Sequence, residues 1–112
     1  MPANTDTQAL FNQKLFAAMK PSACFYNIGR GSTVDQSALL AALRQGRPAA
    51  AYLDVTQPEP LPPDDPLWDT PNCFVTPHSA GGHADESERI IAHFVGNLRR
   101  FERGERLHDR VI

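Results

Sequence analysis

The sequence lacks any long apolar segment. No apolar run approaches the ~20 residues that a membrane-spanning helix requires, and the N-terminal stretch has neither the basic nor the apolar region of an export signal. An excess of positive charge is also absent, since the formal net charge is −2. A protein without a broad positive field has little attraction for nucleic acids or anionic membranes. We therefore expect a cytoplasmic protein that binds neither nucleic acid nor membranes.

Cysteine is scarce: the 112 residues include only Cys24 and Cys73, and both lie in apolar stretches. We interpret them as buried free thiols in a reducing compartment rather than as a disulfide or a metal-binding pair. His83 and His93 have no clustered partners of the kind that a metal site requires. No metal site is predicted.

The apolar residues, 41% of the chain, recur at spacings that distinguish helices from strands. Apolar residues three and four positions apart predict helices, and short runs without polar alternation predict strands that are covered on both faces of a parallel sheet. The predicted helices span residues 8–19, 36–45 and 85–103, and the predicted strands span residues 23–28, 49–55 and 73–76. Asp35 is a suitable N-cap for the second helix.

A proline-rich segment separates the second and third predicted strands. It holds six prolines between Pro58 and Pro71, too many for regular structure, so we expect a stiff, ordered loop with one helical turn near Leu67 and Trp68. The alternation of helices and strands predicts an α/β fold with a parallel sheet. A sheet of so few strands is thin, which indicates that part of the domain is missing.

Polar side chains follow the end of each predicted strand. Arg30 follows the first strand, Asp54 and Glu59 follow the second, and His78 follows the third. Ligands of open parallel sheets bind outside the carboxyl ends of the strands. We therefore expect an arginine, two carboxylates and a histidine to gather at one edge of the sheet.

Each of these residues also has a purely structural interpretation. Arg30, between two glycines, is typical of a solvent-facing turn. Asp54 could cap a turn, and Glu59 could simply make the proline-rich loop soluble. His78 could be a structural histidine. Their convergence favours catalysis instead. A neighbouring carboxylate makes a histidine a usable acid or base, and a guanidinium binds a carboxylate through two parallel hydrogen bonds.

Four segments resemble the D-isomer-specific 2-hydroxyacid dehydrogenases, in the order in which that family carries them. Asn27-Ile28-Gly29-Arg30-Gly31 and the residues that follow resemble the family's second signature. Ala51-Tyr52-Leu53-Asp54-Val55, with Glu59-Pro60, resembles the third signature, and residues 72–82 resemble the histidine segment. Residues 2–21 are similar to the stretch that precedes the family's arginine.

The resemblance implies a role for each residue at this edge. Arg30 would bind the substrate's carboxylate and carbonyl oxygen, His78 would exchange the hydroxyl proton, and Glu59 would hold and tune His78. Asp54 would contact the nicotinamide carboxamide. The other residues that would line the nicotinamide site are Ile28, Gly29, Ser79, Ala80 and Gly81. The implied reaction is hydride transfer between NAD or NADP and C2 of a small 2-oxo or 2-hydroxy acid, such as glyoxylate or hydroxypyruvate.

The implied fold is a partial Rossmann-like parallel sheet flanked by helices, the C-terminal half of a dinucleotide-binding domain. Residues 1–84 would form that half, and residues 85–112 would form a helix and tail that pack toward a substrate domain. The family's G-x-G-x-x-G turn, which holds the pyrophosphate, is absent from this sequence. We therefore interpret the chain as a fragment of an oxidoreductase that by itself neither binds the cofactor tightly nor turns over.

An alternative function is that of a non-catalytic module that associates with itself or with a partner. Half a sheet leaves an edge strand and apolar helix faces unpaired, and both features favour association. For the enzyme as well, we expect either a homo-oligomer or association with the missing N-terminal half. The sequence does not distinguish NAD from NADP, because the residue that contacts the ribose 2′ position lies outside this chain.

Overall fold

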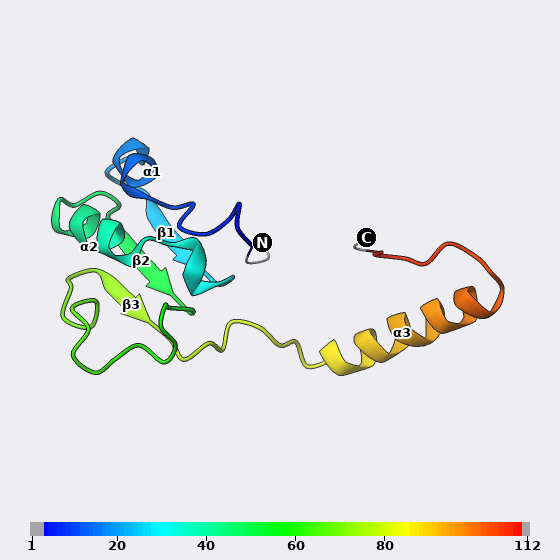
Figure 1. Ribbon diagram of the computed structural model, residues 1–112. Helices are drawn as coiled ribbons and strands as arrows, with labels where there is room; N and C mark the ends of the chain where they lie inside the picture. The colour runs from blue at the N-terminus through cyan, green and yellow to red at the C-terminus, as the bar shows by residue number, and fades with distance from the viewer. Residues whose placement is uncertain (1–3, 111–112) are drawn as a thin grey trace. The chain divides into compact units, whose positions relative to one another are not determined.

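The computed structural model of the chain describes residues 4–110 (Figure 1). Its helices are α1 (Gln13–Ala18), α2 (Gln36–Arg44) and α3 (Glu86–Glu102), and a 3-10 turn, η1, spans Gly31–Thr33. Its strands are β1 (Cys24–Asn27), β2 (Ala50–Leu53) and β3 (Cys73–Val75). The chain divides into two compact units, Met1–Gly81 and Gly82–Ile112. Residues 1–3 and 111–112 lie outside the described residues. They include the first residues of the predicted segment 1–84 and of the family-like stretch 2–21, and the last residues of the predicted segment 85–112.

The first unit is built on a three-stranded sheet in the order β1-β2-β3. Both strand pairs are parallel, with Phe25 opposite Ala51 and Leu53 opposite Val75. The predicted α/β fold with a parallel sheet is therefore confirmed, and so are the approximate positions of the strands. Because all strands run the same way, the segments that follow β1, β2 and β3 leave the sheet at the same edge.

The first helix begins later in the chain than the apolar spacing predicts. It begins at Gln13 rather than near residue 8, because the Asn12 side chain caps it by accepting hydrogen bonds from the amides of Lys14 and Leu15. The preceding residues pair with another segment instead: the Phe11 amide donates to the Thr33 carbonyl (3.0 Å). The second helix begins as predicted, with Asp35 accepting from the Ala38 amide (3.0 Å).

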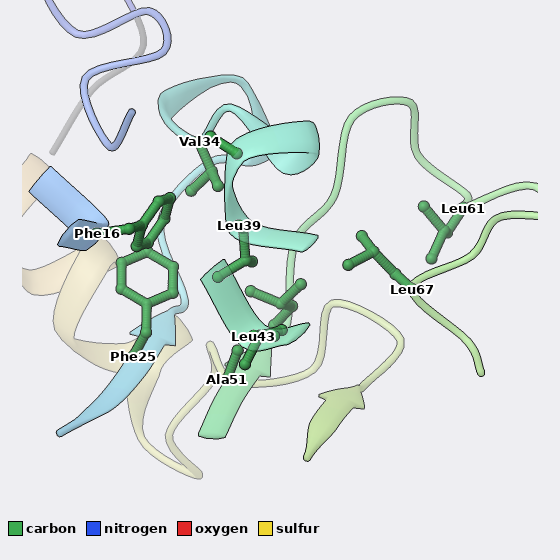
Figure 2. Packing of buried hydrophobic residues seen from close by; sticks show 10 residues of the cluster. Phe16, Phe25, Val34, Leu39, Leu43, Ala51, Leu61 and Leu67 are labelled. Carbon is green, nitrogen blue, oxygen red and sulfur yellow. The ribbon is translucent and has the colours of Figure 1, made fainter. Parts of the chain in front are cut away.

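The core lies between the sheet and the helices α1 and α2 (Figure 2). Phe16 of α1 meets Phe25 of β1 edge to face, with ring centroids 5.2 Å apart. Leu39 and Leu43 of α2 complete this packing. The proline-rich segment adds a second group of core residues, Leu61 and Leu67. It is ordered by turns, one of which is closed by a hydrogen bond from the Trp68 amide to the Asp65 carbonyl (3.1 Å); at Leu67 and Trp68 the chain forms a turn rather than an assigned helix.

The prediction that the strands are covered on both faces is wrong within the described part of the first unit. Tyr26, Tyr52 and Phe74 project from adjacent strands onto one face and are 64%, 38% and 50% exposed. Their rings stack, with centroids 4.8 Å and 4.9 Å apart. The connection between β2 and β3 contains no helix. The strand sequences are therefore uniformly apolar because one face of the sheet packs against the core and the other carries exposed aromatic side chains.

The second unit contains α3, which ends in a short turn. Acidic residues lie in its first turn and basic residues in its last, as the helix dipole favours. The predicted apolar stripe is present but exposed, at Ile90, Ile91, Phe94, Leu98 and Phe101. Within residues 4–110, no helix is both long enough and apolar enough to cross a membrane.

The two cysteines are free, but they are not both buried as predicted. Cys24 is exposed, because it lies on the outward-facing side of β1, whereas Cys73 is half-buried. Burial, with a smaller contribution from the charge of Asp65, raises the pKa of the Cys73 thiol to about 11. At pH 8 this thiol therefore exists almost entirely in its unreactive protonated form.

This difference predicts selective alkylation. Iodoacetamide at pH 8 should modify Cys24 at least about tenfold faster than Cys73, because the thiolate is the reacting species. Peptide mass spectrometry over a time course measures both rates. In urea the two rates should converge, and equal rates in the folded protein would contradict the burial of Cys73.

Candidate active site

A glutamate and a histidine meet beyond the carboxyl ends of β2 and β3. His78 Nδ1 lies 2.5 Å from Glu59 Oε1, and both side chains are close to half exposed. Glu59 lies in the connection between β2 and β3, and Thr76-Pro77 connects the end of β3 to His78. Because Glu59 binds Nδ1, Nε2 is the ring nitrogen left for proton exchange with a ligand.

Local contacts hold Glu59 in place. The Thr56 amide donates to Glu59 Oε2 (3.4 Å), and the Thr56 hydroxyl donates to the Pro58 carbonyl (2.8 Å). The hydrogen bond from His78, more than any other interaction, holds the pKa of the Glu59 carboxyl below its usual value. Glu59 is therefore a carboxylate at neutral pH, and it accepts the hydrogen bond that orients the imidazole.

Asp54 lies directly after β2 and is buried, at 5% exposure. Its Oδ1 accepts hydrogen bonds from the Thr76 hydroxyl (2.5 Å) and the Ser79 amide (2.8 Å), and its Oδ2 accepts from the Ala80 amide (2.8 Å). These bonds, the one from Thr76 foremost, hold the pKa of the Asp54 carboxyl below its usual value. Asp54 therefore caps the turn that carries His78, which is the structural interpretation considered from the sequence.

Arg30 follows β1 at the same edge but is not paired with the other site residues. Its side chain is exposed, and Nη1 donates to the Gly29 carbonyl (2.7 Å). The backbone around it is fixed by Asn27, whose side-chain amide donates to the Arg30 carbonyl (3.0 Å) and whose side-chain oxygen accepts from the Gly29 amide (3.2 Å). The hydrogen bonds of Asn27 therefore hold the turn that carries the guanidinium.

A pocket of about 430 Å³ opens beside the Glu59–His78 pair. Asp54 and Thr56 contribute to its polar side, and Trp68 to its apolar side. The remaining lining residues are Pro60, Leu61, Val75, Thr76 and Pro77. Arg30 is not among them, so the structure brings Asp54, Glu59 and His78 to one pocket and leaves Arg30 at the neighbouring strand end.

Comparison with known proteins shows the family to which the chain belongs. The sequence profile of the D-isomer specific 2-hydroxyacid dehydrogenase, NAD binding domain, matches residues 1–80. The chain belongs to this family. A glyoxylate/hydroxypyruvate reductase B from Citrobacter koseri is 44% identical over 98 residues, which are 88% of this chain and 30% of the relative.

Solved structures of the family show the same fold. A D-isomer specific 2-hydroxyacid dehydrogenase from Xanthobacter autotrophicus Py2, in complex with NADPH and MES, is 40% identical with a TM-score of 0.88 and is matched over 100% of this chain and 46% of its own. An NADPH-dependent glyoxylate/hydroxypyruvate reductase from Sinorhizobium meliloti, in complex with NADP and sulfate, is 34% identical with a TM-score of 0.82. The match covers 96% of this chain and 35% of the reductase.

The family and its Rossmann-type fold, predicted from the motifs, are thus confirmed, and the NADPH and NADP in these neighbours agree with the predicted class of cofactor. The chain spans about a third of the length of the curated relatives that it matches. Among residues 4–110, no group of histidine, cysteine or acidic side chains could hold a metal ion.

Sequence reasoning missed several residues that line the pocket or support its neighbouring turns. Asn27 braces the Arg30 turn, and its position immediately before Ile28-Gly29 is a signal for an Asx turn that could have been recognised. Thr56 and Thr76 bind the two carboxylates, but a threonine near a strand end is too common to single out. Trp68, the only tryptophan, lines the pocket, while its Nε1 donates to the Pro62 carbonyl (2.7 Å).

Gly31 allows the turn that carries Arg30 to touch the segment that carries Glu59. A Cβ atom at Gly31 would lie 1.9 Å from the carbonyl oxygen of Thr56, a backbone atom that cannot yield as a flexible side chain could. Any larger residue therefore forces the two segments apart. This glycine sets the spacing between the Arg30 turn and the Glu59 segment.

Gly31→Ala is expected to destabilise the first unit by about 1–3 kcal/mol, the usual cost of overpacking. Urea unfolding followed by Trp68 fluorescence measures the change. Gly81→Ala is the matched control, because a Cβ atom there would meet no other atom within 4 Å. It should change stability by less than about 0.5 kcal/mol. Equal effects of the two substitutions would show that the close approach at Thr56 is unimportant.

Proposed function

We propose that this chain is the C-terminal part of the NAD(P)-binding domain of an enzyme that interconverts a small 2-oxo acid and its 2-hydroxy acid, with glyoxylate or hydroxypyruvate as the substrate. The observation that carries the proposal is the 2.5 Å contact between His78 Nδ1 and Glu59 Oε1. A histidine held by a carboxylate at the carboxyl edge of a parallel sheet is suited to proton transfer with a ligand bound at that edge.

Each side chain has one task in this proposal. His78 Nε2 donates a proton to the substrate's carbonyl oxygen during reduction and accepts it during oxidation, while Glu59 fixes the ring and its tautomer. Arg30 binds the substrate carboxylate and stabilises the negative charge that develops on the oxygen. To do so, the exposed guanidinium exchanges its contact with the Gly29 carbonyl for the substrate.

In this proposal the nicotinamide ring binds over the surface between the ends of β1 and β3. Ile28 is 67% exposed beside Gly29, so it presents an apolar side chain for such a ring. Asp54 Oδ2 accepts one hydrogen bond, so it retains capacity for a second, from the carboxamide. The Ser79 and Ala80 amides already donate to Asp54, so these two groups are not free to bind the carboxamide. Bound NAD or NADP supplies or accepts the hydride.

The wider organisation belongs to the same proposal. Residues 1–84 form the cofactor-domain half and residues 85–112 lead toward a substrate domain, in a cytoplasmic protein that functions as an oligomer or with the missing half. The exposed stack of Tyr26, Tyr52 and Phe74 supports association. It also favours a second candidate function, a non-catalytic module that binds itself or a partner through this face. Sedimentation of the 112-residue chain as a monomer at micromolar concentration would contradict self-association, for the enzyme and for the non-catalytic module alike.

A chimera tests the catalytic proposal. This chain replaces the matching segment of the NADPH-dependent Sinorhizobium meliloti reductase, and oxidation of NADPH by glyoxylate is followed at 340 nm. Turnover that depends on glyoxylate supports the proposal. A folded chimera that binds NADPH, as seen by fluorescence, yet does not turn over would refute it. The non-catalytic candidate predicts that second outcome.

The pH dependence of the chimera is expected to change with Glu59→Gln. Reduction requires a proton on His78, and Glu59→Gln removes the negative charge beside that imidazole. Because the pKa of the Glu59 carboxyl lies below its usual value, the alkaline limb of the reductive profile does not report on the glutamate. Glutamine retains the hydrogen bond without the charge, so the alkaline limb should move to lower pH, and the oxidative profile should extend to lower pH. Unchanged limbs would refute the pairing.

A further inference from the structure

All the hydrogen bonds found for the Asp54 carboxylate come from the segment around His78. The donors are the Thr76 hydroxyl, two residues before His78, and the amides of Ser79 and Ala80, which follow it. A single buried carboxylate thus binds the chain on both sides of the histidine. Asp54 itself does not contact the imidazole.

The backbone of His78 requires such support. Its φ angle is +53°, in the left-handed region that residues with a Cβ atom rarely adopt. The His78 amide donates to the Thr76 carbonyl (3.0 Å), which closes the turn but does not connect it to the sheet. The Thr76 amide connects the start of the turn to β2 by donating to the Leu53 carbonyl (2.9 Å), and Asp54, which follows directly from β2, connects the residues after His78.

We propose that Asp54 is a positioning residue, which fixes the turn of residues 76–80 so that His78 Nδ1 reaches Glu59. This inference rests on the proposed function for its catalytic meaning and adds to it a role for Asp54 that requires no cofactor. All three donors belong to the chain itself, so the support exists before any ligand binds.

The role requires a carboxylate rather than an amide. Asparagine has one acceptor oxygen in place of two, so its NH2 group would face one of the donors that Asp54 now binds. A donor left without an acceptor in a buried place weakens the turn by more than the loss of one bond alone. The carboxylate remains ionised through the neutral pH range, because the pKa of Asp54 lies below its usual value.

Nuclear magnetic resonance of the 112-residue chain, with no cofactor present, tests the inference. Two signals are followed: the exchange rates of the Ser79 and Ala80 amide protons, and the downfield resonance of the His78 Nδ1 proton bound to Glu59. Asp54→Asn should accelerate both exchange rates at least tenfold and abolish the downfield resonance. Thr76→Val, which removes one donor and keeps the carboxylate, should produce smaller changes in the same direction.

The matched control is Asp35→Asn, which alters another aspartate that binds a backbone amide, at the start of α2. Asparagine caps helices as well as aspartate does, so this variant should leave both signals unchanged. If Asp54→Asn does not fold, as judged by the amide spectrum of β1 and β2, Thr76→Val decides alone. Exchange rates within twofold of those of the unmodified chain, with the Nδ1 resonance retained, would overturn the inference.

These measurements are independent of turnover. An inactive chimera combined with loss of the His78 signal in Asp54→Asn would refute the proposed function and leave the positioning role standing. An active chimera in which Asp54→Asn weakens NADPH binding while both signals persist would overturn the positioning role, because Asp54 would then act on the cofactor alone.

Discussion

His78→Ala is expected to slow turnover of the chimera by about 10²–10⁴-fold in both directions, the usual contribution of a positioned acid–base group. Without the imidazole, no side chain at the end of β3 can give the proton to the substrate oxygen or take it back. The alkaline limb of the reductive pH profile should disappear as well. Steady-state rates of glyoxylate reduction and glycolate oxidation, each measured across pH, provide the test.

The control for this substitution is another histidine of the chain. His93 lies in α3, where its Nε2 is 3.1 Å from the Asn97 side-chain nitrogen. His93→Ala should leave the rate within about twofold, as expected for a surface substitution. A fall of less than tenfold in His78→Ala would remove the histidine from the acid–base role.

Much of the fold follows from local patterns that the amino-acid sequence displays on its own. The parallel sheet was predictable because continuous apolar runs alternate with helical spacing. The cap at Asp35 was predictable because a cap depends only on its neighbours along the chain. The true start of the first helix was not, because Phe11 pairs with Val34, a partner distant in sequence. Exposure of the aromatic face was also missed, since an apolar run does not reveal whether a second layer covers it.

The candidate site was predictable to a similar depth. The rule that ligands bind at the carboxyl edge of a parallel sheet selected Glu59 and His78, which the structure brings into contact. The same rule selected Asp54, but not its three bonds to the turn of residues 76–80, because these depend on how β2 and β3 lie side by side. In the sequence, Gly31 marks only a break after a strand. Its contact with Thr56 depends on tertiary packing.

Arg30→Ala is expected to lower kcat/KM for glyoxylate by about 30- to 5,000-fold, which corresponds to the roughly 2–5 kcal/mol lost when one partner of a hydrogen-bonded charge pair is removed. Because the guanidinium binds the substrate carboxylate before and during hydride transfer, KM should rise and kcat should fall together. The folded structure should be unaffected, since the side chain is exposed and its hydrogen bond is to the adjacent residue.

Arg30→Lys separates charge from geometry. Lysine keeps the positive charge but cannot form two parallel hydrogen bonds to a carboxylate, so its kcat/KM should lie between those of the unmodified chimera and Arg30→Ala. Arg44→Ala, at the end of α2, is the control for the loss of one positive charge and should leave kcat/KM within about twofold. If Arg30→Ala kept kcat/KM within threefold, the substrate carboxylate would have to be bound elsewhere. The pocket beside Glu59 and Trp68, which Arg30 does not line, would then be the place to search.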